Sequence, residues 1–69
     1  MSGETTVAIE FVGGGPMDGR FDQLLEQGAR LGRENRIPDG ARMYVYRLEH
    51  LRPNNERLVW RLLRTEAIA

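Results

Sequence analysis

Two runs in the second half of the chain, Met43–His50 and Arg57–Leu63, constrain the fold more than any other feature. They hold both tyrosines and the only tryptophan. Aromatic and β-branched residues alternate with polar ones in these runs, as is typical of half-buried strands. The Arg-Pro-Asn-Asn segment between them, residues 52–55, has the composition of a turn. The sequence therefore predicts a β-hairpin here.

The expected strands of this hairpin are Ala41–His50 and Arg57–Thr65. The second has an alternative, because Asn54 could cap a helix with an apolar stripe. Leucine, arginine and glutamate are all good helix formers. We favour the strand because the surrounding pattern is rich in β-formers, but the sequence leaves residues 55–67 open between strand and helix.

Alternation also limits how the two strands pair. The side chains expected on their shared apolar face are Tyr44, Tyr46, Leu48, Leu58, Trp60 and Leu62. Slipping one strand by one residue would turn all of its side chains to the other face. Only registers in which the numbers of two paired residues add up to an even value therefore keep this face together. The preferred register sets Tyr46 opposite Trp60 and Leu48 opposite Leu58. It also sets Glu49 opposite Arg57, an opposite-charge pair.

The first half of the chain predicts a second hairpin. From Thr6 to Val12, apolar residues alternate with Ala8 and Glu10, which indicates a strand. The segment Gly13–Gly19 ends that strand, because three glycines, a proline and an Asp-Gly pair are turn signals. A phosphate-binding loop is a weak alternative, since no lysine or hydroxyl residue follows the glycines. The returning strand is expected at Arg20–Leu25.

The stretch that joins the second and third predicted strands is ambiguous. Residues 21–33 also fit a helical template, although Gly28 and Gly32 weaken a helix by about 1 kcal/mol each. The sequence leaves this segment open between strand, helix and loop. Residues 30–40, with Pro38 and a second Asp-Gly pair, are expected to form an exposed connection.

Together these segments predict a mainly β fold. We expect a small antiparallel sheet of four strands, as a meander or a partly open barrel, with a long loop or short helical turn between strands 2 and 3. A chain of 69 residues has room for one domain, which we place at residues 6–66. Residues 1–5 are expected to be a disordered N-terminus and residues 67–69 a C-terminal tail.

The stretch Glu10–Arg20, Glu-Phe-Val-Gly-Gly-Gly-Pro-Met-Asp-Gly-Arg, resembles the opening of small uncharacterised bacterial and phage-encoded proteins. Those proteins begin with a strand, a Val-Gly-Gly-Pro-x-Asp-Gly turn and a second strand. Their later Tyr-x-Tyr-x-Leu-like strand is similar to Tyr44–Leu48. An extra glycine lengthens the turn in this chain. The resemblance implies a compact β-rich fold and carries over no activity, substrate or site residue.

Residue types exclude most catalytic chemistry. The chain has no cysteine, so neither disulfides nor thiolate metal sites are available, and one histidine cannot form an all-imidazole site. His50 has Glu49 and Glu56 near it in sequence but no nucleophile or oxyanion device. We therefore expect no enzyme activity, no catalytic residue, no metal site and no cofactor.

Charge is balanced, with ten arginines against ten acidic residues. A balanced chain is a poor match for indiscriminate binding to nucleic acid or to an anionic membrane. The apolar runs are far shorter than the ~20 residues of a bilayer-spanning helix. The N-terminus lacks the basic start and apolar middle of a signal peptide, so the cytoplasm is the expected location.

These observations favour a binding or assembly module that acts through its sheet edges or through an apolar and arginine-rich face. The expected partner is a second copy of the chain or an unidentified protein. The candidate contact residues are Arg42, Arg47, Arg57 and Arg61. The alternative is single-stranded nucleic acid, RNA above all, bound by these arginines and by aromatic rings on the sheet. Against it, a domain this small needs most of its aromatic rings inside.

Overall fold

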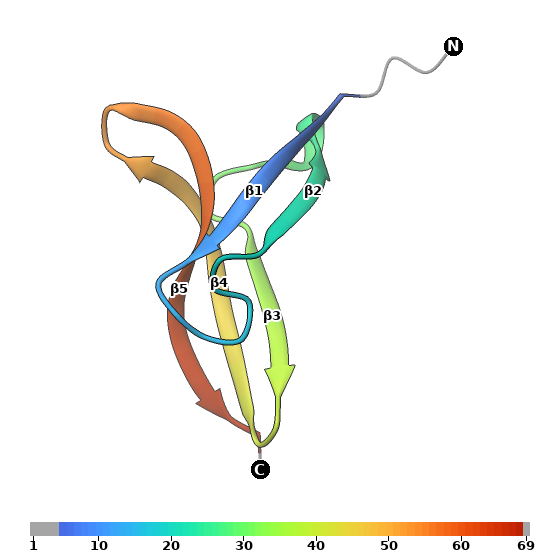
Figure 1. Cartoon of the computed structure of the whole chain (residues 1–69), viewed down its shortest axis with the longest axis vertical. Coiled ribbons are helices and arrows are strands. Elements are labelled where there is room, and N and C mark those ends of the chain that lie inside the picture. Colours follow the sequence, from blue (N-terminus) through green and yellow to red (C-terminus); the bar gives the residue numbers. More distant parts are fainter. Residues whose placement is uncertain (1–4, 69) are drawn as a thin grey trace.

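The computed structural model describes residues 5–68, which form one five-stranded sheet (Figure 1). The elements are β1 (Thr6–Val12), β2 (Phe21–Leu25), the 3-10 turn η1 (Glu26–Gly28), β3 (Glu34–Asp39), β4 (Arg42–Arg52) and β5 (Asn55–Ala67). Their order across the sheet is β2-β1-β5-β4-β3. The mainly β fold is confirmed, as is a short helical turn after the second strand.

Two details of the predicted sheet are wrong. It has five strands instead of four, and it is mixed, because β1 runs parallel to β5 while every other pair is antiparallel. Of the predicted disordered N-terminus, residues 1–4 lie outside the described residues. Of the predicted tail, Ala67 is the last residue of β5 and residue 69 lies outside the described part.

The strand that the sequence did not predict is β3, which lies where an exposed connection was expected. In an antiparallel ladder, hydrogen-bonded pairs alternate with non-hydrogen-bonded pairs. The Leu48 N–H donates to the Arg33 carbonyl, and counting along the ladder from there makes Pro38 and Met43 a non-hydrogen-bonded pair. The nitrogen of Pro38 therefore faces the open edge of the sheet. A proline is compatible with an edge strand in this position because no ladder bond is lost.

The aromatic hairpin formed by β4 and β5 is confirmed, and the helix considered for residues 55–67 is wrong. The predicted apolar face is present, but its register is wrong by two residues. Leu48 lies opposite Trp60, and Tyr46 lies opposite Leu62.

The reason for this shift lies at the end of the hairpin. Arg52 pairs with Asn55 across a two-residue turn, and a bulge then sets two β5 residues, Glu56 and Arg57, against Leu51. The turn and the bulge together displace the pairing by two positions. A second irregularity leaves Leu63 without an opposite residue and bends β5.

Phe11 lies at the centre of the core. The face of the sheet that carries it, called the inner face, has five buried side chains: Ile9, Phe11, Tyr46, Leu48 and Trp60. The Phe11 ring meets the Tyr46 ring edge-on, with centroids 4.9 Å apart, and stacks on Trp60 at 6.0 Å. Such contacts add about 0.5–1.5 kcal/mol to the burial of the rings themselves.

Tyr46 also fixes the glycine-rich loop between β1 and β2. Its hydroxyl donates to the Gly14 carbonyl at 2.8 Å and accepts from the Met17 N–H at 3.4 Å. Gly13, Gly14 and Gly15 all have φ between 84° and 100°, which side-chain-bearing residues rarely adopt. The loop is thus tied to β4, and the hydroxyl of this buried ring has polar partners.

Alkaline pH is expected to destabilise the protein through this contact. Burial raises the pKa of Tyr46, the Met17 hydrogen bond opposes the shift, and the charges of Asp18 and Tyr44 add to it. A raised pKa favours the protonated hydroxyl in the folded state, so this stabilisation is complete below pH ~10 and is lost as the pH rises through the folded pKa.

Urea unfolding monitored by circular dichroism at pH 8 and pH 11 checks this expectation. The free energy of unfolding should fall between the two pH values, and the Tyr46→Phe variant should show a smaller fall because it lacks the hydroxyl whose pKa is raised. An equal fall in both proteins would show that Tyr46 is not responsible.

Candidate functional site

Two of the four candidate arginines form close ion pairs on the face opposite the core, called the outer face. Arg57 contacts Glu10 of β1 at 3.1 Å. Arg61 contacts Glu49 of β4 at 3.1 Å and also donates to the Leu51 carbonyl at 2.9 Å. Both guanidinium groups hold neighbouring strands together, so neither is an uncommitted cation for a ligand phosphate.

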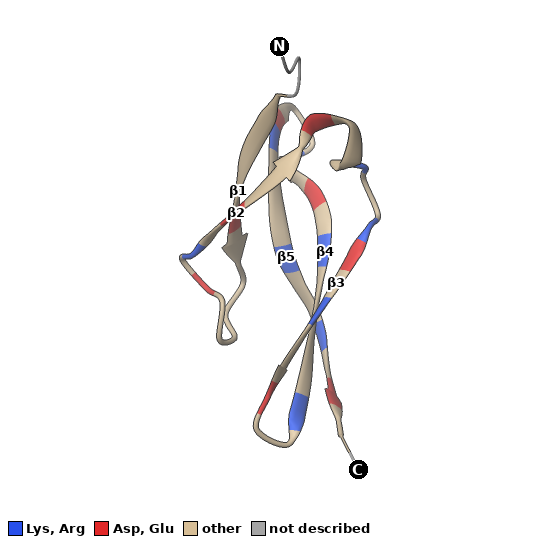
Figure 2. Ribbon diagram, turned by 90° about the vertical axis from the view of Figure 1, so that its right-hand side faces the viewer, with Lys and Arg blue, Asp and Glu red and all other residues tan. Residues whose placement is uncertain are grey.

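Arg47, the third candidate, belongs to a chain of charges across β3, β4 and β5. Its guanidinium lies 3.7 Å from Glu34, and Glu34 lies 3.6 Å from Arg64. Glu66 in turn bonds Arg64 at 2.7 Å and Arg36 at 3.0 Å. The hydrogen bond from Arg64 lowers the pKa of Glu66, and the same bond raises the pKa of Arg64. Acidic and basic residues therefore alternate in this network, and Figure 2 shows residues of both signs along these strands.

Arg42 stands apart from the other three candidates. It is exposed at the start of β4, opposite Ala67, and has no carboxylate partner within residues 5–68. The structure thus does not bring the four arginines into one cluster. They are distributed along two strands, and three of them are neutralised.

The apolar part of the outer face is covered. Val45 and Val59 point to this side, and both have no exposed surface. Long arginine side chains commonly cover apolar residues in this way. Leu63, which has no opposite residue on β4, is 40% exposed, so this large apolar side chain remains accessible.

The aromatic rings required for base stacking are mostly inside. Phe11, Tyr46 and Trp60 are at most 1% exposed. Phe21 is the exception among the phenylalanines, because it is 58% exposed. Phe21 lies on β2, at an open edge of the sheet.

The open edge of β2 exposes both apolar side chains and backbone polar groups. Phe21 and Leu25 are 58% and 37% exposed and flank Gln23 on the outer face. Two hydrogen bonds at the ends of the β1–β2 ladder fix which residues bond across it: the Glu26 N–H donates to the Thr5 carbonyl, and the Phe11 N–H donates to the Arg20 carbonyl. The N–H and C=O groups of Phe21, Gln23 and Leu25 consequently point away from β1.

The two edges of the sheet differ in their protection. On the β3 edge, Pro38 has no N–H, and Glu34, Arg36 and Asp39 place charge along the strand. These are the features by which natural proteins prevent strand addition. β2 has no proline and one charged residue, Asp22. It is the edge better suited to accept another strand. The sequence predicted a returning strand at Arg20–Leu25, but the pattern did not show that this strand would form an open edge.

Other classes of site find no support in the part of the chain that is described. Residues 5–68 contain no group of three or more histidine and acidic side chains placed to hold a metal ion. Across the same residues, no helix has the length and apolar character to cross a membrane. His50 is exposed on β4, opposite Leu58, and no ion pair joins it to a described carboxylate. Comparisons with protein-family models, curated proteins and solved structures find no match.

Proposed function

We propose that this chain is a non-enzymatic assembly module that pairs with a second copy of itself through the β2 edge. The observation that carries the proposal is the set of outward backbone groups at Phe21, Gln23 and Leu25, which are flanked by two exposed apolar side chains. An unprotected strand edge of this kind is a template for strand addition.

The edge is complementary to itself. If two β2 strands pair antiparallel about a two-fold axis at Gln23, then Phe21 of each chain lies opposite Leu25 of the other. Phe21, Gln23 and Leu25 then all form hydrogen-bonded pairs across the axis, because such pairs recur at every second residue. The apolar side chains then meet across the axis on one face, as an isologous interface requires.

The proposed contact is short. A strand of five residues is about 17 Å long, and interfaces of this size belong to the weak, transient class. We therefore expect reversible, concentration-dependent dimers. Binding of single-stranded nucleic acid has less support. The protein's rings of Phe11, Tyr46 and Trp60 are buried, and three of the four candidate arginines are already paired with carboxylates.

The Gln23→Pro variant is expected to be a monomer that retains the fold. Proline removes an outward N–H, whereas the ladder to β1 uses Asp22 and Leu24, so the hairpin keeps its bonds. Sedimentation equilibrium over a range from micromolar to millimolar concentration measures the effect. Gln23→Ala, which keeps the N–H, serves as the control and should still dimerise.

Two results would contradict the proposal. One is a wild-type chain that stays monomeric at millimolar concentration. The other is a folded Gln23→Pro chain that associates as strongly as the wild type.

A further inference from the structure

A second opening lies between β1 and β5. These strands pair over three positions, Glu10–Val12 with Val59–Arg61. Before this contact the two strands diverge, as Figure 1 shows for the β1–β2 hairpin and the tip of the β4–β5 hairpin. Thr6–Ile9 and Asn55–Leu58 therefore border a gap inside the sheet, here called the notch.

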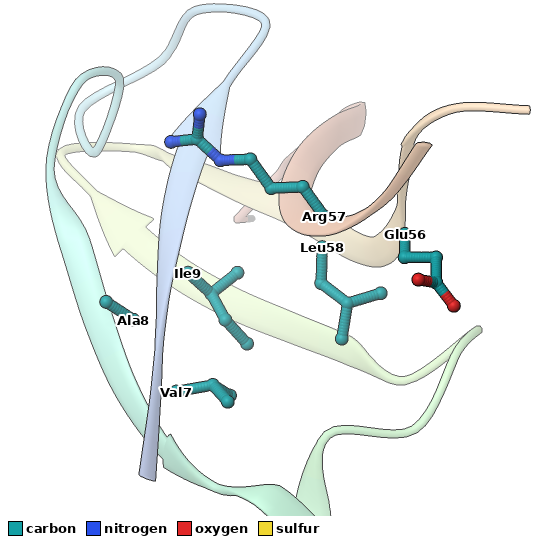
Figure 3. A pocket seen from close by; sticks show the side chains of 6 residues that line it. All are labelled: Val7, Ala8, Ile9, Glu56, Arg57 and Leu58. Carbon is teal, nitrogen blue, oxygen red and sulfur yellow. The ribbon is translucent and has the colours of Figure 1, made fainter. Parts of the chain in front are cut away.

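The notch is a lined cavity of about 360 Å³. Val7, Ile9 and Leu58 project into the same space from the two opposite strands (Figure 3). Ala8 and Arg57, which point to the other face of the sheet, also contribute to the lining. Because residues of both faces line it, the cavity passes between β1 and β5. The edges of these two strands therefore border it.

Backbone polar groups are available along the β1 side of the notch. The bond from the Glu26 N–H to the Thr5 carbonyl shows which β1 residues bond to β2. Counting from it, the backbone groups of Val7 and Ile9 are the ones that bond to β2. The N–H and C=O of Thr6 and Ala8 therefore point toward the notch. Groups of this kind need a partner, either water or another strand.

The charge at the notch is acidic. Arg57 is engaged with Glu10 on the outer face. Glu56 is exposed, points to the same side as Leu58, and forms no ion pair within residues 5–68 (Figure 3). A ligand with an apolar group and a cation fits these walls.

We propose that the notch binds an extended peptide segment of a partner protein as an additional strand. The segment runs antiparallel to both β1 and β5, the slightly more stable arrangement per residue. It places an apolar side chain between Val7 and Leu58, which are only partly buried. Glu56 precedes Leu58 by two residues and lies on the same side of β5 (Figure 3), so a basic side chain two residues after the apolar one meets Glu56. This site is independent of the β2 edge.

An NMR titration with a synthetic peptide tests the proposal. The probe is acetyl-Thr-Val-Thr-Lys-Thr-amide, added to the full-length ¹⁵N-labelled chain at low ionic strength. The expected result is a set of chemical-shift changes at the amides of Thr6–Ile9 and Asn55–Leu58. The reversed peptide, acetyl-Thr-Lys-Thr-Val-Thr-amide, should bind more weakly, because its cation falls away from Glu56.

Two controls separate strand insertion from nonspecific contact. Glu56→Gln should weaken binding of the probe about two- to fivefold, the range of a solvent-exposed ion pair, while Glu26→Gln at η1 should leave it unchanged. A probe with N-methylated valine and lysine cannot form the ladder and should lose binding. Shifts confined to β2, equal effects of the two glutamine variants, or unaltered binding of the methylated peptide would each overturn the proposal.

Discussion

Replacing Phe11 with alanine is expected to leave the protein unfolded at room temperature. The Phe11 side chain is 1% exposed and contacts both Tyr46 and Trp60. Truncating a buried phenylalanine to alanine costs about 3–5 kcal/mol, because the apolar contacts are lost and a cavity remains. A single core in a chain of 69 residues rarely supplies more than roughly 3–5 kcal/mol in total. The loss is therefore as large as the stability.

Fluorescence of Trp60 and far-UV circular dichroism measure this effect. The wild type should show a cooperative urea transition, whereas Phe11→Ala should show the emission of a solvent-exposed indole without urea. Phe21→Ala is the matched control, because the same side chain is 58% exposed there. Its free energy of unfolding should change by less than about 0.5 kcal/mol at concentrations where the chain is monomeric. A cooperative, equally stable Phe11→Ala protein would contradict the assignment of the core.

Gly15→Ala is expected to cost about 3 kcal/mol of unfolding free energy. Gly15 has φ +84°, so any Cβ is strained there by about 1–3 kcal/mol. That Cβ would also overlap the Tyr46 hydroxyl oxygen and approach the Tyr44 ring. Moving the hydroxyl leaves the Gly14 carbonyl without its donor, which adds about 1–3 kcal/mol if the carbonyl stays buried.

Gly14→Ala isolates the backbone part of this cost. Its φ is +100°, but a Cβ there has no neighbouring atom within 4 Å. Urea unfolding of the two variants should therefore show a larger loss for Gly15→Ala. Removing the hydroxyl in a Gly15→Ala, Tyr46→Phe double variant should reduce the difference. Equal losses in the two single variants would mean that Tyr46 does not hold the loop.

Local pattern was sufficient for part of the fold. Alternation from Thr6 to Val12 and the glycines that follow predicted the first hairpin, and the same alternation gave the shared face of Tyr46, Leu48 and Trp60. The register was not predictable from pattern, because a two-residue turn and a bulge set it. A shift of two residues preserves every side chain's face, so hydrophobicity cannot detect it.

Features that depend on the arrangement of distant segments were not predictable. The segment containing Pro38 has the composition of a loop, and its identity as a strand follows from its position at the sheet edge. The partner of Arg57 is Glu10, 47 residues away, and the parallel contact of β1 with β5 creates that pair. The arginines were therefore identified as candidate contacts before their carboxylate partners were known.

The difference between the two edges of the sheet limits the size to which the proposed assembly grows. When β2 pairs with β2, each chain presents β3 at the outside, and Pro38 together with the charges of that strand opposes further addition. Association then closes at two chains. If both edges were equally receptive, every added molecule would expose a fresh template, and the product would be an open-ended filament.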